Sequence, residues 1–239
     1  MTTASLFPCF CGIRNVYMGF ADDVCGVGLM SSWTTVVESM LREESSKINE
    51  VLSLRDLTRE SLIKIGREIV RSSGYVITYI HSGMWEEAEK NLRELREAYS
   101  KLREVLSKHP CYEFTNMVID YLSEYAEAVI FYNLVKHRKL VLSEELGIDC
   151  VPYVLGLLDV VGELKRFVLT LLSTKRSLSE ANEFFKLMEI IYEHLRHLDY
   201  PDAILPNARR KIDVARGVIE SLRYLLVEVS FKEQYSTQT

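Results

Sequence analysis

Four carboxylates fall within two strongly apolar segments of the chain. Residues 121–135 read YLSEYAEAVIFYNLV and carry Glu124 and Glu127, and residues 153–166 read YVLGLLDVVGELKR and carry Asp159 and Glu163. Residues three or four positions apart lie on one face of a helix, so each pair of acids shares a face. Helices that are apolar almost all round are expected to be buried, where an unpaired charge is unfavourable. The four acids therefore need a chemical explanation.

The simplest explanation is a solvated helix face, where acidic pairs at these spacings are common. Two features of the sequence argue against it. The segment Ala126–Phe131 leaves little surface for solvent, and Asp159 has no Lys or Arg to pair with before Lys165. The small residues beside the acids also allow two helices to approach closely; these are Ala126, Ala128 and Gly162.

Carboxylates that converge from two facing helices form an oxygen-only cation site. Such a site suits Mg²⁺, with Mn²⁺ as the alternative. Mg²⁺ that is held by carboxylates and keeps some of its waters is typical of phosphodiester chemistry. A ferritin-like di-iron site would need Glu-x-x-His on two helices. Residue 127 is Glu and the residue three after Glu163 is Arg166, so the sequence disfavours di-iron.

Hydrophobic periodicity predicts an all-α bundle of six or seven long helices. No segment alternates like a strand, and no glycine-rich phosphate loop or CxxC pair is present. Pro152 is placed in the first turn of a helix, and Ser179 is the predicted N-cap of the next one. Six helices are predicted, over residues 34–81, 84–107, 113–142, 152–172, from 177–182 to about 198, and 206–229. The first of them has a break at residues 53–56 as an alternative. Residues 143–150 are a connection with a short helical turn.

Composition divides the chain into three parts. Residues 1–30 lack helical periodicity and read as a poorly ordered extension, neither a signal peptide nor a membrane span. Residues 31–230 read as a single helical domain, and residues 231–239 as a polar tail. The five cysteines do not form a metal signature, and their odd number favours a reduced, intracellular protein. With a net charge of −5, binding to nucleic acid would need locally clustered cations or a metal ion.

Two sequence motifs and one later segment resemble a known family. Glu124–Ala128 reads E-Y-x-E-A and is followed by a hydrophobic run and a basic end at Lys136–Arg138. Tyr153–Arg166 reads Y-x-x-G-x-x-D-x-x-G-E-L-x-R. From Thr34 to Val229 the chain resembles the translin family, and within it the translin-associated factor X branch; residues 198–215, LDYPDAILPNARRKIDVA, resemble the archaeal members.

The resemblance implies an all-helical subunit of a hollow homo-oligomer, commonly an octamer, that encloses short RNA. The factor X branch is a Mg²⁺-dependent endoribonuclease, whereas the translin branch binds RNA or single-stranded DNA without the acids. Glu124, Glu127, Asp159 and Glu163 are then the expected catalytic residues and metal ligands, with Mg²⁺ or Mn²⁺ as the ion. For Glu163 the alternative is an ion pair with Arg166 or Lys165. The expected substrate is short single- or double-stranded RNA, or single-stranded DNA, and the expected location is the cytoplasm, away from membranes.

RNA would need cations close to an acidic site. Lys136, Arg138 and Lys139 end one predicted helix, where a cation is also favoured by the helix dipole. Lys165 and Arg166 follow Glu163, and Arg209, Arg210 and Lys211 form the densest basic run, near a helix start that the dipole does not favour for cations. His81, His109, His194 and His197 read as structural or surface residues. A non-catalytic binder of RNA or single-stranded DNA and a purely structural helical oligomer remain alternatives to the nuclease.

Overall fold

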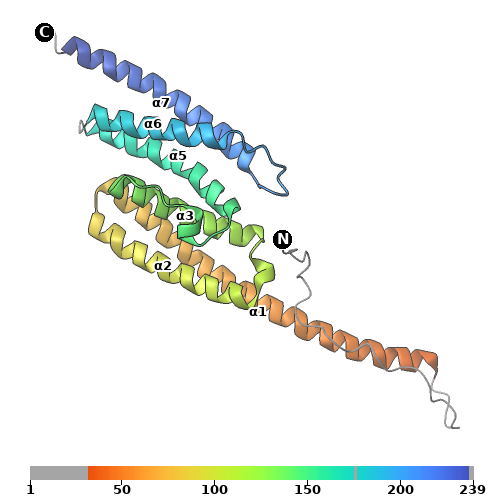
Figure 1. Ribbon diagram of the computed structural model, residues 1–239. Helices are drawn as coiled ribbons and strands as arrows, with labels where there is room; N and C mark the ends of the chain where they lie inside the picture. Colours follow the sequence, from red (N-terminus) through yellow and green to blue (C-terminus); the bar gives the residue numbers. More distant parts are fainter. Residues whose placement is uncertain (1–31, 175–176, 237–239) are drawn as a thin grey trace, which may run out of the picture. The chain divides into compact units, whose positions relative to one another are not determined.

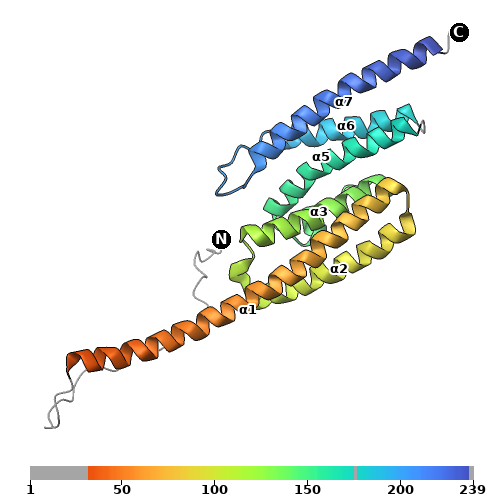
Figure 2. The ribbon, with the colours of Figure 1, turned by 180° about the vertical axis from the view of Figure 1, so that it is seen from behind.

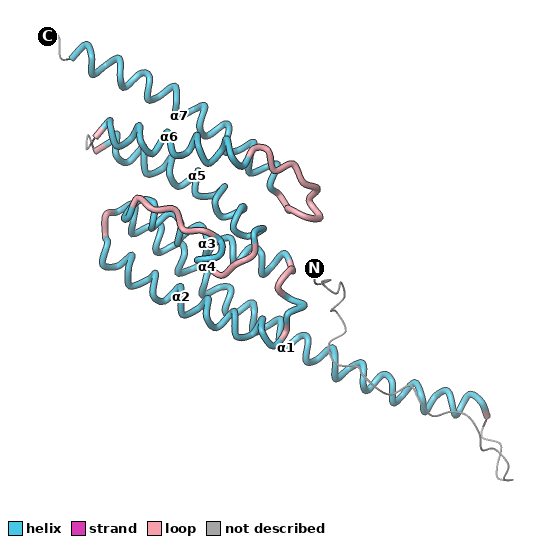
Figure 3. The backbone as a smooth tube through the Cα atoms, in the orientation of Figure 1, coloured by secondary structure: helices cyan, strands magenta, loops and turns pink. Residues whose placement is uncertain are grey.

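The computed structural model describes residues 32–174 and 177–236. Within these ranges the chain forms seven α-helices and one short 3₁₀ helix, and no strand (Figure 1). Figure 3, coloured by secondary structure, shows helices joined by loops and turns. The predicted all-α class is confirmed. The predicted extension at residues 1–30 and the last three residues of the predicted tail lie outside the described residues.

The chain divides between residues 60 and 61 into two units, which we describe separately. The first unit contains the start of α1, which runs from Trp33 to Ser82. This helix passes through residues 53–56 without the alternative break, and residues 33–60 contain neither Gly nor Pro to interrupt it. Every residue from Ser32 to Leu57 is exposed. The exposed side chains include large apolar ones at helical spacing, namely Trp33, Val36, Val37, Met40, Leu41, Ile48, Val51 and Leu52.

The second unit holds the remainder of α1 and all the other helices. These are α2 (Trp85–Lys108), the 3₁₀ helix η1 (Pro110–Tyr112), α3 (Asn116–His137), α4 (Ser143–Leu146), α5 (Cys150–Ser173), α6 (Leu178–Leu195) and α7 (Ala208–Ser236). Helix α5 packs against α3 on one side and against α6 and α7 on the other. Figure 2, seen from behind, shows the same order. One apolar core joins these helices, with Leu95, Phe131, Leu164, Met188 and Leu222 among its fully buried side chains.

Two helix ends differ from the prediction for local reasons. Helix α3 ends at His137 rather than near residue 142, because Arg138 adopts a left-handed conformation with φ of 55°. This conformation stops a helix, and it is unusual for a residue other than glycine. Helix α6 is capped by Ser177 and not by Ser179, since the Ser177 hydroxyl accepts the N–H of Glu180. The other predicted helices agree with the structure to within a few residues at each end, except that α7 extends to Ser236.

Among the described residues, no helix combines the length and the apolar character that crossing a membrane would require.

Candidate functional site

The two acid-bearing helices, α3 and α5, approach each other closely at Gly156. A Cβ atom built on this glycine would lie 2.6 Å from the Ser123 carbonyl oxygen, 2.8 Å from the Ala126 Cβ and 3.0 Å from the Glu127 nitrogen. Glycine is therefore required where α5 crosses the turn of α3 that carries Glu127. The close approach predicted from small residues is present, but Gly162 does not provide it. A Cβ built on Gly162 meets no atom within 4 Å.

The packing of α3 against α5 brings Glu124, Asp159 and Glu163 within electrostatic range of Glu127. Each carboxylate is partly buried. Burial raises the pKa of Glu127 to about 9, and the charges of Asp159, Glu124 and Glu163 add to this effect. Burial and the charge of Asp159 also raise the pKa of Glu124. The prediction that these acids lie together on buried helices is supported, and their mutual repulsion means that a cation placed among them would be stabilised.

Lys211, at the start of α7, is the cation that the sequence did not place beside these acids. Its Nζ donates to both carboxylate oxygens of Asp159, with 2.5 Å to Oδ1. The expectation that Asp159 has no cationic partner is therefore wrong, because the partner is 52 residues away along the chain. Burial still raises the pKa of Asp159, although Lys211 opposes it. A hollow of about 370 Å³ opens beside this pair and is lined also by Glu124, Ser123 and Asn207.

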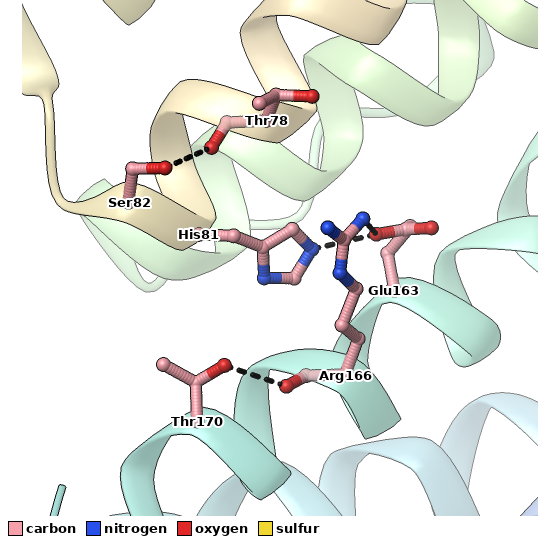
Figure 4. Close-up of polar contacts among 6 residues, drawn as sticks. All are labelled: Thr78, His81, Ser82, Glu163, Arg166 and Thr170. Atoms are coloured by element: carbon pink, nitrogen blue, oxygen red, sulfur yellow. Dashed lines mark hydrogen bonds and ion pairs between the residues drawn. The ribbon is translucent and has the colours of Figure 1, made fainter.

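Glu163 has two partners on its side of the site, as Figure 4 shows. Its Oε2 accepts a hydrogen bond from His81 Nε2 at 2.6 Å and lies 3.8 Å from Arg166 Nη1. Of the two predicted competitors for Glu163, Arg166 is thus present, while Lys165 donates to Ser221 instead.

His81 is the functional candidate that sequence reasoning missed. Its side chain is only 6% exposed. The ring lies 5.1 Å from that of Phe131 and 6.3 Å from that of Phe167, between centroids. Its Nδ1 is buried without a hydrogen-bond partner among the described residues. The polar contact of the His81 side chain within the described part of the chain is with Glu163, an arrangement that can hold a carboxylate in place.

The predicted basic residues fall into two groups. Arg210 and Lys211 line a second hollow of about 390 Å³ beside Asp159. The others are engaged with groups outside the acid cluster, or with Glu163 at its edge. Lys136 lies 4.0 Å from Glu89 and 4.6 Å from the Trp85 ring centroid, Arg138 pairs with Glu180, Lys139 with Glu145 at 2.8 Å, and Arg209 with Asp199 at 2.8 Å, while Lys165 and Arg166 have the partners given above.

The acids have the donor chemistry of a Mg²⁺ site without its final geometry. All four side chains offer carboxylate oxygens, the donors that hard divalent cations prefer. Across residues 32–174 and 177–236, however, no three His, Cys, Asp or Glu side chains are already arranged as a metal-ligand group. Lys211 neutralises Asp159 where a cation would otherwise be stabilised. A metal ion held by Asp159 would have to displace Lys211 from that carboxylate.

Comparisons with known proteins give a consistent picture. The model of the translin family matches residues 57–222. The uncharacterized protein MJ0175 of Methanocaldococcus jannaschii is 35% identical over 180 residues, covering 74% of this chain and 79% of that protein. A translin-associated protein X homolog of Schizosaccharomyces pombe is 21% identical over 197 residues, covering 76% of this chain and 85% of that one.

Solved structures of the same type share the fold. The structure of an AfC3PO–duplex RNA complex superposes with a TM-score of 0.71 at 28% identity, covering 79% of this chain and 97% of that one. The crystal structure of apo-NeC3PO gives a TM-score of 0.64 at 23% identity, covering 84% and 98%, and shows likeness of fold alone. The family model spans most of the chain, and the fold and the archaeal relative agree with it. The chain belongs to the translin family.

Proposed function

We propose that this protein is the subunit of a translin-type oligomer that binds short RNA and cleaves it with the help of Mg²⁺. The observation that carries the proposal is the close packing of α5 on α3 at Gly156, beside Glu127, whose carboxylate interacts electrostatically with Glu124, Asp159 and Glu163. A related structure, AfC3PO, is a complex with duplex RNA, which supports RNA as the ligand class.

Glu124, Glu127, Asp159 and Glu163 are the residues that would hold the divalent ion. When bound, such an ion lowers the pKa of a water molecule and stabilises charge on a phosphate. The protein supplies the orientation of these carboxylates: Gly156 allows α3 and α5 to approach, and His81 fixes Glu163. Mn²⁺ offers the same preference for oxygen ligands as Mg²⁺ and should substitute for it.

Arg210 and Lys211 are the cations best placed to receive the RNA backbone. Both line the hollow that adjoins Asp159, and both lie at the start of α7. Once Lys211 leaves Asp159, its ammonium group is available for a phosphate oxygen in the same hollow. Arg209 points to a different partner, Asp199, so it contributes less to this surface.

The test is cleavage of a short RNA by the purified protein with Mg²⁺ and with EDTA. Glu127→Gln removes one ligand with little change of shape and is expected to lower the rate at least a hundredfold. Glu97→Gln, on the exposed face of α2, is the matched control and should cleave normally. Equal rates for Glu127→Gln and the native protein, with both folded, would contradict the assignment.

A non-catalytic binder is the second candidate, and the Asp159–Lys211 ion pair favours it. In that case Lys211 stays on Asp159, and the acids serve only to position the basic edge of α7. Affinity for single-stranded RNA or DNA would then be unaffected by EDTA, and no cleavage would occur at any Mg²⁺ concentration. Cleavage that EDTA abolishes would exclude this candidate.

We further propose that the chain forms a homo-oligomer, with an octamer as the expected size. The exposed apolar side chains of residues 33–57 support this, because a run of such residues is rarely left uncovered in a monomer. Light scattering coupled to size-exclusion chromatography measures the mass directly. A monomeric mass at micromolar protein concentration would refute the assembly.

A further inference from the structure

A third hollow lies next to the acid cluster and has a different chemical character. It encloses about 430 Å³, within the roughly 300–1,000 Å³ of typical small-ligand sites. It shares Asn116, Ile119, Pro206 and Asn207 with the hollow beside Glu124 and Asp159. Asn207 also lines the basic hollow of Arg210 and Lys211. The hollow beside Glu124 and Asp159 therefore adjoins both of the others.

The third hollow presents an aromatic ring and apolar groups to solvent. Phe114, in the segment between η1 and α3, is 72% exposed, and Ile204, in the loop before α7, is 58% exposed. Both line the hollow together with Pro152 and Pro206. An exposed aromatic ring at the edge of a nucleic-acid site is the usual platform on which a base stacks.

The charged groups of the third hollow are carboxylates, and the amides of Asn116 and Asn207 lie among its other polar groups. Glu113, Asp149 and Asp202 line it, and the described residues that line it include no Lys or Arg. Glu113 is paired with Arg103 at 2.5 Å, and Asp149 accepts the N–H of Val151 as the cap of α5. Asp202 is exposed. A phosphate would be repelled here, whereas a carboxylate accepts hydrogen bonds from the exocyclic amino group of a base.

We propose that this third hollow binds one nucleobase of the substrate, stacked on Phe114 with its amino group directed to Asp202. The inference rests on the proposed function and extends it to the choice of base. Adenine, cytosine and guanine carry an exocyclic amino group and uracil does not, so a hydrogen bond to Asp202 favours amino bases over uracil. The backbone phosphates of the same RNA lie over Arg210 and Lys211 in the basic hollow.

The test uses nucleosides, which carry no phosphate, and does not depend on catalysis. Adenosine, cytidine and uridine are titrated into the full-length protein, and binding is followed by NMR saturation transfer. Adenosine and cytidine should bind more tightly than uridine. Phe114→Ala should weaken their binding by about five- to hundredfold, the range for loss of one stacked base. Tyr224→Ala, which removes an exposed ring on α7, should change nothing. Asp202→Asn should reduce the preference over uridine.

Three results would overturn the inference. The first is equal binding of the three nucleosides, or no binding of any. The second is unchanged binding in Phe114→Ala. The third is dissociation of the native oligomer by Phe114→Ala in size-exclusion chromatography, which would make Phe114 a contact between subunits. If the protein binds adenosine through Phe114 but cleaves no RNA, the proposed nuclease activity fails and the base site stands. If it cleaves RNA but ignores nucleosides, the reverse holds.

Discussion

Replacing Gly156 with alanine should separate the two helices that carry the acids. The added Cβ would lie 2.6 Å from the Ser123 carbonyl oxygen, whereas ordinary contacts begin at 3.4 Å. The shortfall is about 0.8 Å, and the atoms that it meets belong to the backbone and to a Cβ, which cannot rotate away. Overpacking of this kind typically destabilises a protein by about 1–3 kcal/mol.

The same substitution at Gly162 provides the matched control. Gly162 lies on the same helix, six residues later, and an added Cβ there meets nothing within 4 Å. Alanine is favoured over glycine inside a helix by roughly 0.5–1 kcal/mol. Gly162→Ala should therefore be neutral or stabilising. For a chain of this size each kcal/mol corresponds to about 2–4 °C in Tm, so the two variants should differ by several degrees.

Thermal unfolding at one fixed protein concentration measures the stability difference, because oligomers unfold at concentration-dependent temperatures. The cleavage assay measures the effect on the site, where a displacement near 1 Å is expected to lower the rate about a hundredfold. Gly156→Ala should lose both stability and cleavage, and Gly162→Ala should lose neither. If the two variants melt together, or if Gly156→Ala cleaves RNA at the native rate, the packing of α5 on α3 does not position the acids.

Three further substitutions test Glu127 and two residues that contact the other acids, His81 and Lys211. Without metal, Glu127→Gln should stabilise the fold by about 1 kcal/mol or more at pH 8 and by little at pH 4. The reason is that a folded-state pKa of about 9 makes the native protein lose stability as pH rises from about 4.5 to 9. Denaturant unfolding at both pH values checks this, and a pH-independent difference would contradict it. His81→Ala should destabilise the fold by about 1–3 kcal/mol and raise the Mg²⁺ concentration needed for half-maximal cleavage, because Glu163 loses its donor. His81→Gln should restore part of the stability and part of the Mg²⁺ affinity. Equal Mg²⁺ requirements in the Ala and Gln variants would show that the histidine serves packing alone. Lys211→Met should weaken RNA binding and lower the slope of log affinity against log salt by about 1. Lys186→Met, on the exposed face of α6, is the control and should leave the slope unchanged. A native slope in Lys211→Met would show that Lys211 does not contact the RNA backbone.

The helices could be predicted from the sequence because each one leaves a local signal. The apolar periodicity and the position of Pro152 are read over a few residues. The end of α3 could not be predicted in this way. Arg138 adopts φ of 55°, pairs with Glu180 and lies 4.3 Å from the Phe184 ring centroid. The sequence around Arg138 contains no pattern that predicts these partners.

The candidate site was predictable in part for the same reason. Glu124 and Glu127 share a face through helical spacing alone, and so do Asp159 and Glu163. The partners His81 and Lys211 lie 82 and 52 residues from the acids that they contact, so no local pattern connects them. Gly156 and Gly162 look alike in sequence, and only the packed structure shows which one α3 approaches.

Binding of Mn²⁺ to the RNA-free protein tests the cation site most directly. Free Mn²⁺ is measured by electron paramagnetic resonance during a titration of the native protein, and of Asp159→Asn, Glu127→Gln and Glu97→Gln. The native protein and Glu97→Gln should bind Mn²⁺ in a manner that Mg²⁺ competes away, and the two site variants should lose at least tenfold in affinity. Unchanged Mn²⁺ binding in both site variants, or its absence from the native protein, would contradict the assignment of these carboxylates as metal ligands.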